Sequence, residues 1–310
     1  MTDWLPKAGP EQLRERARIL EGIRRFLGAR NVLEVQTPVV TRHGITDPNI
    51  DSLGLSSGGY LRTSPEYFHK RLLAAGLTDL YELGPVFRAN EHGRLHRQEF
   101  TMLEWYRVGW TWQELAREVV ELISACWPER TRPANLTPVM LSWQQCFEQE
   151  FDGLDPLTCS DQALLTLTES LPADCDRDMR LDYLFATRIQ PGFAHRPVTI
   201  VHHYPATQAA LARLDPHDPR LAERFEVFLG QIELANGYQE LCSASEQRDR
   251  FVNDNTRRQA LGRQPMPLDE NLLEALEHGL PECAGVALGI DRLIMCLTGA
   301  DDIAQVSSFS

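Results

Sequence analysis

The sequence predicts an α+β fold built on an antiparallel β-sheet. Strand-like segments follow one another in meanders, and helical segments lie at the ends and flanks instead of alternating with the strands. The chain also lacks G-x-x-x-x-G-K-[ST] and G-x-G-x-x-G, the loops that hold nucleotide phosphates in parallel-sheet folds. If the chain binds a nucleotide, it therefore does so on a different kind of sheet.

Composition narrows the classes of function. The 310 residues are 43% hydrophobic and 24% charged, which is typical of a globular protein with one large domain or two small ones. The net charge of −13 argues against duplex nucleic acid or an anionic membrane as the principal ligand. The seven cysteines are scattered without a C-x-x-C pair, and we find neither a signal sequence nor a membrane-spanning run. We therefore expect a cytoplasmic protein with reduced thiols.

The first 127 residues carry clear periodicities. Leu13, Ala17 and Leu20 recur at helical spacing, which predicts an amphipathic helix over 11–29. A charged stretch at 88–98 separates two strand-like runs and predicts a long antiparallel hairpin with a polar tip. The other expected elements are, in chain order, a strand at 32–35, a turn-rich loop or hairpin at 41–60, a helix at 65–75, strands at 80–87 and 100–108, and a helix at 112–127.

A proline-punctuated linker then leads into the second half. Residues 142–190 indicate several short helices without a chemical motif. We therefore expect a small helical insertion or subdomain, at approximately 130–195, within a single domain spanning 1–310. The later patterns predict, in order, strands at 198–203, 224–229 and 231–234, helices at 245–261 and 268–278, a strand at 285–289 and a helix at 291–297.

The polar hairpin tip is the first candidate site. It carries three arginines and two histidines, namely Arg88, Arg94, Arg97, His92 and His96. Guanidinium groups supply forked donors that suit phosphate oxygens. From spacing alone, an ordinary solvated loop explains this composition equally well.

Two glutamates seven residues apart, Glu233 and Glu240, form the second candidate. On a regular strand such residues point to opposite faces, but Asn236-Gly237 can bend the backbone so that both carboxylates converge. Two carboxylates together with phosphate oxygens suit a magnesium ion. Surface glutamates are common, so the pair alone is a weak indication.

The third candidate is the glycine-bearing strand that ends in Gly289-Ile290-Asp291-Arg292. Glycine in a strand allows a ligand to approach the backbone closely. Arg292 is unusual in the first turn of a helix, which favours anions. A ligand phosphate or a buried carboxylate beside Arg292 would explain its position.

Together these segments resemble the class II aminoacyl-tRNA synthetases. The stretch from Phe87-Arg88 to Glu104-Trp105-Tyr106 is similar to their motif 2, and Gly285 to Arg292 is similar to their motif 3. Residues 26–38 resemble motif 1, the helix and strand of the dimer interface in that family. With Glu233 to Glu240 added, the closest branch is the lysyl enzymes. The resemblance covers nearly the whole chain and implies an antiparallel sheet flanked by helices, in a homodimer.

Length narrows the branch further. Lysyl-tRNA synthetases carry an anticodon-binding domain before motif 1, and here motif 1 begins too early to leave room for one. The short chain, Thr63-Ser64-Pro65-Glu66-Tyr67 and Gly285-Val286-Ala287-Leu288-Gly289 resemble the lysyl-synthetase paralogues that ligate (R)-β-lysine to elongation factor P. This resemblance implies activation of (R)-β-lysine by ATP with Mg²⁺ as an acyl-adenylate. Transfer would follow to a lysine ε-amine of elongation factor P, without tRNA as the main substrate.

The resemblance also implies roles for individual residues. ATP binding is implied for Arg88, Ala89, Asn90, Arg97, Phe100, Glu233, Leu234, Gly289 and Arg292. Amino-acid binding is implied for Ser64, Pro65, Glu66, Tyr106 and Glu240, and magnesium binding for Glu233 and Glu240. Asn90 stands where the family has glutamate, so Glu91 is an alternative contact for adenine. Ala287 replaces a glycine of the lysyl-tRNA synthetases, which fits discrimination between α- and β-lysine.

Two other functions stay open. One is an enzyme that activates α-lysine, with or without charging tRNA. The other is a paralogue without catalysis that binds or regulates a partner. The sequence retains the complete phosphate and metal set of the family, which a paralogue without catalysis would not need.

Overall fold

The helix boundaries follow from local sequence signals. In the computed structural model, which describes residues 4–129, 131–172 and 174–309, helix α1 (Pro10–Gly28) begins with proline in its first turn. Helix α3 (Trp112–Cys126) begins with a capping box, in which the side chains of Thr111 and Glu114 each accept a backbone N–H of the other residue. None of the helices in the described ranges combines the length and the apolar composition that a bilayer crossing needs.

The remaining elements follow the predicted order, except that the strand at 139–142 was not predicted. The other α-helices are α2 (Glu66–Ala74), α4 (Trp143–Glu150), α5 (Asp161–Leu167), α6 (Arg177–Leu184), α7 (Ala244–Ala260), α8 (Glu270–Gly279) and α9 (Ile290–Thr298). The strands are β1 (Leu33–Glu34), β2 (Val40–Thr41), β3 (Leu53–Gly54), β4 (Tyr60–Leu61), β5 (Leu80–Phe87), β6 (Glu99–Val108), β7 (Val139–Ser142), β8 (Val198–Pro205), β9 (Leu221–Leu229), β10 (Ile232–Gln239) and β11 (Cys283–Gly289). Strand β10 is longer than predicted, because polar residues on one of its faces obscure the apolar alternation.

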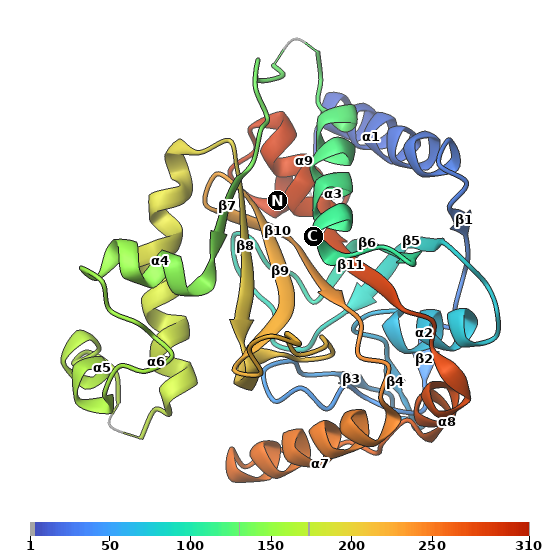
Figure 1. Cartoon of the computed structure of the whole chain (residues 1–310). Helices are drawn as coiled ribbons and strands as arrows, with labels where there is room; N and C mark the ends of the chain where they lie inside the picture. Colours follow the sequence, from blue (N-terminus) through green and yellow to red (C-terminus); the bar gives the residue numbers. More distant parts are fainter. Residues whose placement is uncertain (1–3, 130, 173, 310) are drawn as a thin grey trace.

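The α+β prediction is confirmed, and the sheet is mixed at its edges. Eight strands form one sheet in the order β1-β5-β6-β11-β10-β9-β8-β7 (Figure 1). The six central strands are antiparallel, as predicted. The edge strands β1 and β7 run parallel to β5 and β8, which the sequence patterns did not predict. Parallel neighbours require a long crossover connection, and long segments join both pairs here.

The crossover between β7 and β8 contains the predicted helical segment. Helices α4 to α6 and two short helical turns, 185–189 and 190–195, lie to one side of the sheet (Figure 1). Their apolar side chains, including Trp143 and Phe147, form a separate core that also takes in Phe228 of β9. The segment predicted as an insertion at 130–195 therefore includes one strand of the main sheet, β7.

The main core lies on one face of the sheet. Side chains of α1, α3 and α9, such as Ile23, Leu115 and Leu293, pack there against Trp105 of β6 and Val286 of β11. Because successive strand residues alternate between faces, neighbouring positions on these strands point to the opposite side. That second face remains free of these three helices and carries the candidate site.

Candidate active site

A cavity of about 520 Å³ lies over the second face of the sheet. Its floor comes from alternate residues of the central strands. On β6 these are Phe100, Met102, Glu104 and Tyr106, on β11 they are Gly285, Ala287 and Gly289, and on β10 they are Asn236 and Tyr238, followed by Glu240 just after the strand. The walls come from α2, α7, the hairpin tip and residues of α6. The cavity therefore draws on all three segments that the sequence singled out.

The strand register divides this cavity into two ends. Phe100 lies at the start of β6, and Gly289 at the end of β11 pairs next to it with Met102. Tyr106, six residues along β6, pairs with Gly285. Glu233, near the start of β10, lies at the first end, and Glu240, which follows the last residue of β10, lies at the second. Most of the residues predicted to bind ATP thus gather at one end, and most of those predicted to bind the amino acid at the other.

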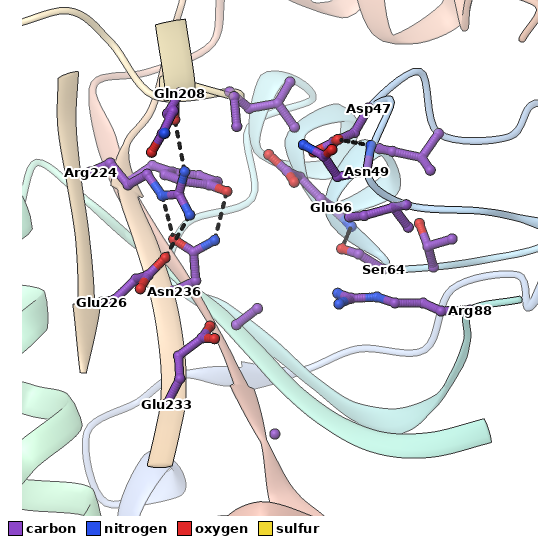
Figure 2. Close-up of a pocket in the computed structure, with 18 of the residues that line it drawn as sticks. Asp47, Asn49, Ser64, Glu66, Arg88, Gln208, Arg224, Glu226, Glu233 and Asn236 are labelled. Carbon is purple, nitrogen blue, oxygen red and sulfur yellow. Dashed lines mark hydrogen bonds and ion pairs between the residues drawn. The ribbon is translucent and has the colours of Figure 1, made fainter. Parts of the chain in front are cut away.

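Arg88 dominates the first end. Its backbone N–H donates to the carbonyl of Gln98 at 2.8 Å, which closes the hairpin tip, and its guanidinium lies 5.2 Å from the ring centroid of Phe100. Figure 2 shows the guanidinium directed across the pocket toward the strand that carries Glu233. Burial lowers the pKa of Arg88, and among the described residues its Nε, which is buried, has no hydrogen-bond partner. A half-buried guanidinium with an unused donor at this position suits an anionic ligand.

Arg292 lies at the same end and has several partners. Its Nη1 donates to the carbonyl of Glu233 at 3.0 Å, and its Nε donates to the carbonyl of Leu95 at 3.2 Å. Its Nη2 lies 2.6 Å from Nε2 of His96. Backbone oxygens of the hairpin and of β10 therefore position this arginine at the cavity wall. These contacts explain why an arginine occupies the first turn of α9.

Most of the residues implied for ATP line the cavity, but two do not. Arg97, Phe100, Leu234 and Gly289 line it, whereas Ala89 and Asn90 are absent from its walls. The N–H of Ala89 donates to the carbonyl of Asp51 at 2.7 Å, and Asn90 is exposed, with its amide 3.3 Å from the Asp51 carboxylate. Glu91 lines the cavity instead. The structure thus favours Glu91 over Asn90 as the residue that faces a ligand.

The second end contains a buried ion-pair triad. Lys70 is 1% exposed, and its Nζ lies 2.7 Å from Oε1 of Glu66 and 2.7 Å from Oε2 of Glu240. Burial opposes the charge of Lys70, but the two carboxylates outweigh this effect and raise its pKa. Lys70 therefore stays a cation and fixes the positions of both carboxylates. Lys70 is not among the site residues predicted from the sequence.

A hydrogen-bond network supports the triad from below. The Ser64 hydroxyl donates to Glu104 at 2.6 Å and accepts the N–H of Glu66 at 3.0 Å, and the Tyr106 hydroxyl donates to Glu104 at 2.9 Å. Pro65 precedes α2 and does not line the cavity, although Ser64 and Glu66 do. Glu104 thus serves as a buried acceptor that orients the side chains around it.

Gly285 is required by the packing at this end. A Cβ atom there would collide with Oε1 of Glu240 and with the ring of Tyr106. Any larger residue would displace the carboxylate or the phenol. The glycine that the sequence analysis associated with close approach of a ligand therefore also makes room for two side chains of the pocket.

Glu233 and Glu240 both line the cavity, for a reason other than the predicted one. The register between β9 and β10 shifts between Glu233 and Ala235, so a bulge brings Glu233 to the same face as Asn236. Gly237, where a bend was expected, is not bent, and its backbone packs against the ring of Phe225. Glu240 pairs with Lys70, so a metal ion would compete with an ammonium group for its carboxylate.

An acidic and basic cluster on β9 escaped the sequence analysis. Arg224 donates to Glu226 at 2.6 Å, to Asn236 at 3.2 Å and to the carbonyl of Gln208 at 2.8 Å (Figure 2). Burial first, and then the charge of Glu233, raise the pKa of Glu226 to about 7. Glu226 lies seven residues before Glu233, the same spacing that separates Glu233 from Glu240. The repeat of this seven-residue spacing in the sequence could have identified Glu226 as a site residue.

Comparisons with known proteins agree with the geometry. Residues 3–310 match the family model for the class II tRNA synthetases (D, K and N). The chain belongs to this family. This member of the class II synthetases is 43% identical to the elongation factor P–(R)-β-lysine ligase of Photorhabdus laumondii, over 99% of this chain and 97% of that protein. Its identity to the ligases of that name is 42% for Klebsiella pneumoniae and 41% for Vibrio cholerae, over 99% of this chain and 97% and 98% of theirs.

These similarities confirm the predicted family and the predicted closest subfamily. The matches cover this class II chain almost from end to end, so they include the hairpin tip, both glutamates and the glycine-bearing strand. The roles of individual residues rest on the geometry above.

Proposed function

We propose that the chain is an ATP-dependent, AMP-forming ligase that activates (R)-β-lysine and transfers it to a lysine ε-amine of elongation factor P. The observation that carries this proposal is the near full-length similarity to several ligases of that name, at 41–43% identity. The cavity supports it, because arginines lie at one end and carboxylates at the other. An anionic nucleotide and a cationic amino acid fit such a division of charge.

The chemistry needs two steps. In the first, the carboxylate of β-lysine attacks the α-phosphorus of ATP, so that a new C–O–P bond forms and the bond to pyrophosphate breaks. The nucleophile is already ionised, and no general base is required. Arg88 and Arg292 would hold phosphate oxygens, Phe100 would stack on adenine, and the reaction would depend on positioning and charge stabilisation. In the second step the ε-amine attacks the acyl carbon, AMP leaves and the amine loses a proton.

The intact mass of elongation factor P tests this function directly. Unmodified elongation factor P would be incubated with this protein, ATP and Mg²⁺, with (R)-β-lysine, α-lysine or neither. We expect one lysyl increment, larger with (R)-β-lysine. An equal or larger increment with α-lysine would favour the α-lysine-activating alternative. Pyrophosphate exchange without an increment would leave the activation step standing and refute the acceptor.

For magnesium, we propose Glu233 with Glu226 as its protein ligands. Both line the cavity on neighbouring strands, and burial, followed by the charge of Glu233, raises the pKa of Glu226. Each alternative partner of Glu233 already has a cation beside it, Arg224 at 2.6 Å from Glu226 and Lys70 at 2.7 Å from Glu240. Glu226 is the stronger candidate because its strand, β9, pairs directly with the strand of Glu233. When bound, the ion would supply Lewis-acid stabilisation of the phosphate charge.

Isosteric glutamine variants show whether Glu233 binds magnesium together with Glu226 or together with Glu240. We expect Glu226→Gln and Glu233→Gln to raise the Mg²⁺ concentration needed for half-maximal pyrophosphate exchange by about tenfold, the lower range for losing a metal-supporting group. Glu240→Gln should instead raise the KM for the amino acid and leave the Mg²⁺ dependence unchanged. If Glu240→Gln shifts the Mg²⁺ dependence and Glu226→Gln does not, the pair implied by the family resemblance, Glu233 and Glu240, is the correct one.

Three further properties implied by the resemblance are proposals as well. They are a homodimer, a cytoplasmic location and the exclusion of tRNA as the main substrate. Support for the dimer comes from Leu33, in the edge strand β1 of the main sheet, and Val40, in the edge strand β2 of the small sheet β2-β4-β3, whose apolar side chains are 54% and 55% exposed. Exposed apolar residues at a sheet edge are suited to burial against a second copy.

A further inference from the structure

One wall of the amino-acid end belongs to α7. Gln247, Phe251 and Asp254 line the cavity from this helix, at the four- and three-residue spacing of one helical face. The ring of Phe251 lies 5.7 Å from that of Tyr67 in α2, the helix that carries Glu66 and Lys70. Gln247 lies one turn before Phe251, in the first turn of α7. Only residues 240–243 separate the end of β10 from the start of α7, so Gln247 lies close to Glu240 along the chain.

The side-chain oxygen of Gln247 accepts no hydrogen bond from the residues that the structure describes. The residue is 1% exposed, and no hydrogen bond reaches its Oε1 among the described residues. Gln239, a second buried glutamine, shows what a structural role requires. Its Oε1 accepts the N–H of Trp112 at 2.9 Å, and its Nε2 donates to two carbonyls at 3.2 and 3.1 Å. Because buried polar atoms are nearly always paired, the orphan oxygen of Gln247 calls for a donor that enters the cavity.

Glu240 offers a second acceptor at the same end. Its Oε2 lies 2.7 Å from Nζ of Lys70, whereas Oε1 is buried, has no hydrogen-bond partner in the part of the chain that the structure describes, and lies close to Gly285. An ammonium group has three N–H donors and can use several such acceptors at once. The two orphan oxygens thus share one chemical preference, for a cationic donor.

The orientation of the substrate in the cavity decides which of its ammonium groups reaches the unpaired oxygens of Gln247 and Glu240. Activation requires the carboxylate of the amino acid to lie at the end with Arg88 and Arg292. Glu240 lies seven residues after Glu233, just past the end of β10, which corresponds to roughly 20 Å of extended chain. The group of a diamino acid that is farthest from its carboxylate therefore points toward Glu240 and α7.

We propose that Gln247 is a specificity-determining residue that accepts a hydrogen bond from the distal ammonium group of the substrate, beside Oε1 of Glu240. This inference rests on the proposed function, since it takes a diamino acid as the substrate. Gln247 is a binding residue in this view and has no role in the reacting bonds.

Kinetics of pyrophosphate exchange test the proposal. Gln247→Met and Gln247→Leu remove the acceptor at similar volume, and we expect the KM for (R)-β-lysine to rise about 10- to 100-fold, as for the loss of a hydrogen bond to a charged group. The KM for ATP should stay unchanged. Gln247→Glu keeps an acceptor oxygen and should retain a KM near that of the wild type. Gln259→Met, on the exposed side of α7, is the matched control.

Two substrate fragments identify the ammonium group. 6-Aminohexanoate keeps the distal ammonium, and (R)-3-aminohexanoate lacks it. Gln247→Met should weaken inhibition by the first and leave inhibition by the second unchanged. An unchanged KM in both apolar variants, a raised KM in Gln247→Glu, or equal weakening of both inhibitors would overturn the role of Gln247. If the wild type shows no exchange with (R)-β-lysine, the proposed function itself fails, and this inference fails with it.

Discussion

Replacing Arg88 with alanine is expected to reduce pyrophosphate exchange by about 10³-fold or more, the range observed when a charge-stabilising donor or arginine is removed from an active site. The half-buried guanidinium lies at the cavity wall against Phe100, and no hydrogen bond from the described part of the chain engages its Nε. Its charge is therefore available to a phosphate. Lysine keeps the charge but loses the forked donors, so Arg88→Lys should fall between alanine and the wild type.

Folding should survive this substitution. Desolvation of the Arg88 guanidinium opposes its charge, and no hydrogen bond to the described residues compensates its buried Nε, so its removal offsets part of the packing lost against Phe100. Arg94 provides the control, because it lies on the same hairpin but donates to the carbonyl of Asp301 and does not line the cavity. Arg94→Ala should exchange pyrophosphate at nearly the wild-type rate. Near-normal exchange in Arg88→Ala, with its thermal unfolding unchanged, would refute the assignment of the nucleotide end.

Replacing Lys70 with methionine is expected to have the largest effect on stability. The substitution leaves Glu66 and Glu240 buried without their shared counter-ion. Removal of one partner from a buried ion pair costs about 3–5 kcal/mol, and we expect the free energy of unfolding in urea to fall by that amount. The KM for the amino acid should also rise, since the two carboxylates lose their fixed positions.

The other lysine of the chain serves as the control. Lys7 is exposed, so Lys7→Met should leave the urea unfolding curve unchanged. The double variant Lys70→Met with Glu240→Gln removes one of the two uncompensated charges and should recover part of the lost free energy. Equal stability of Lys70→Met and the wild type would mean that the ion-pair triad does not support the fold.

Much of the fold was predictable because its signals are local. The helical spacing at 11–29, the capping residues before α3 and the charged tip between β5 and β6 each involve residues within a few turns of one another. Hydrophobic periodicity shows which face of an element is buried, but not which elements meet. The parallel pairing of β1 and β7 at the sheet edges therefore escaped prediction, since it depends on long crossover connections.

The same distinction between local signals and contacts of distant segments applies to the candidate site. The sequence by itself determined the residues of the three motifs, because each motif is a short continuous segment with its own chemistry. Only the tertiary structure placed Lys70 between Glu66 and Glu240 and set the orphan oxygen of Gln247 in the cavity wall. It also replaced the expected bend near Gly237 by a bulge after Glu233. Ion pairs, unpaired atoms and strand register arise where segments far apart in the chain pack together, and local patterning carries no information about those contacts.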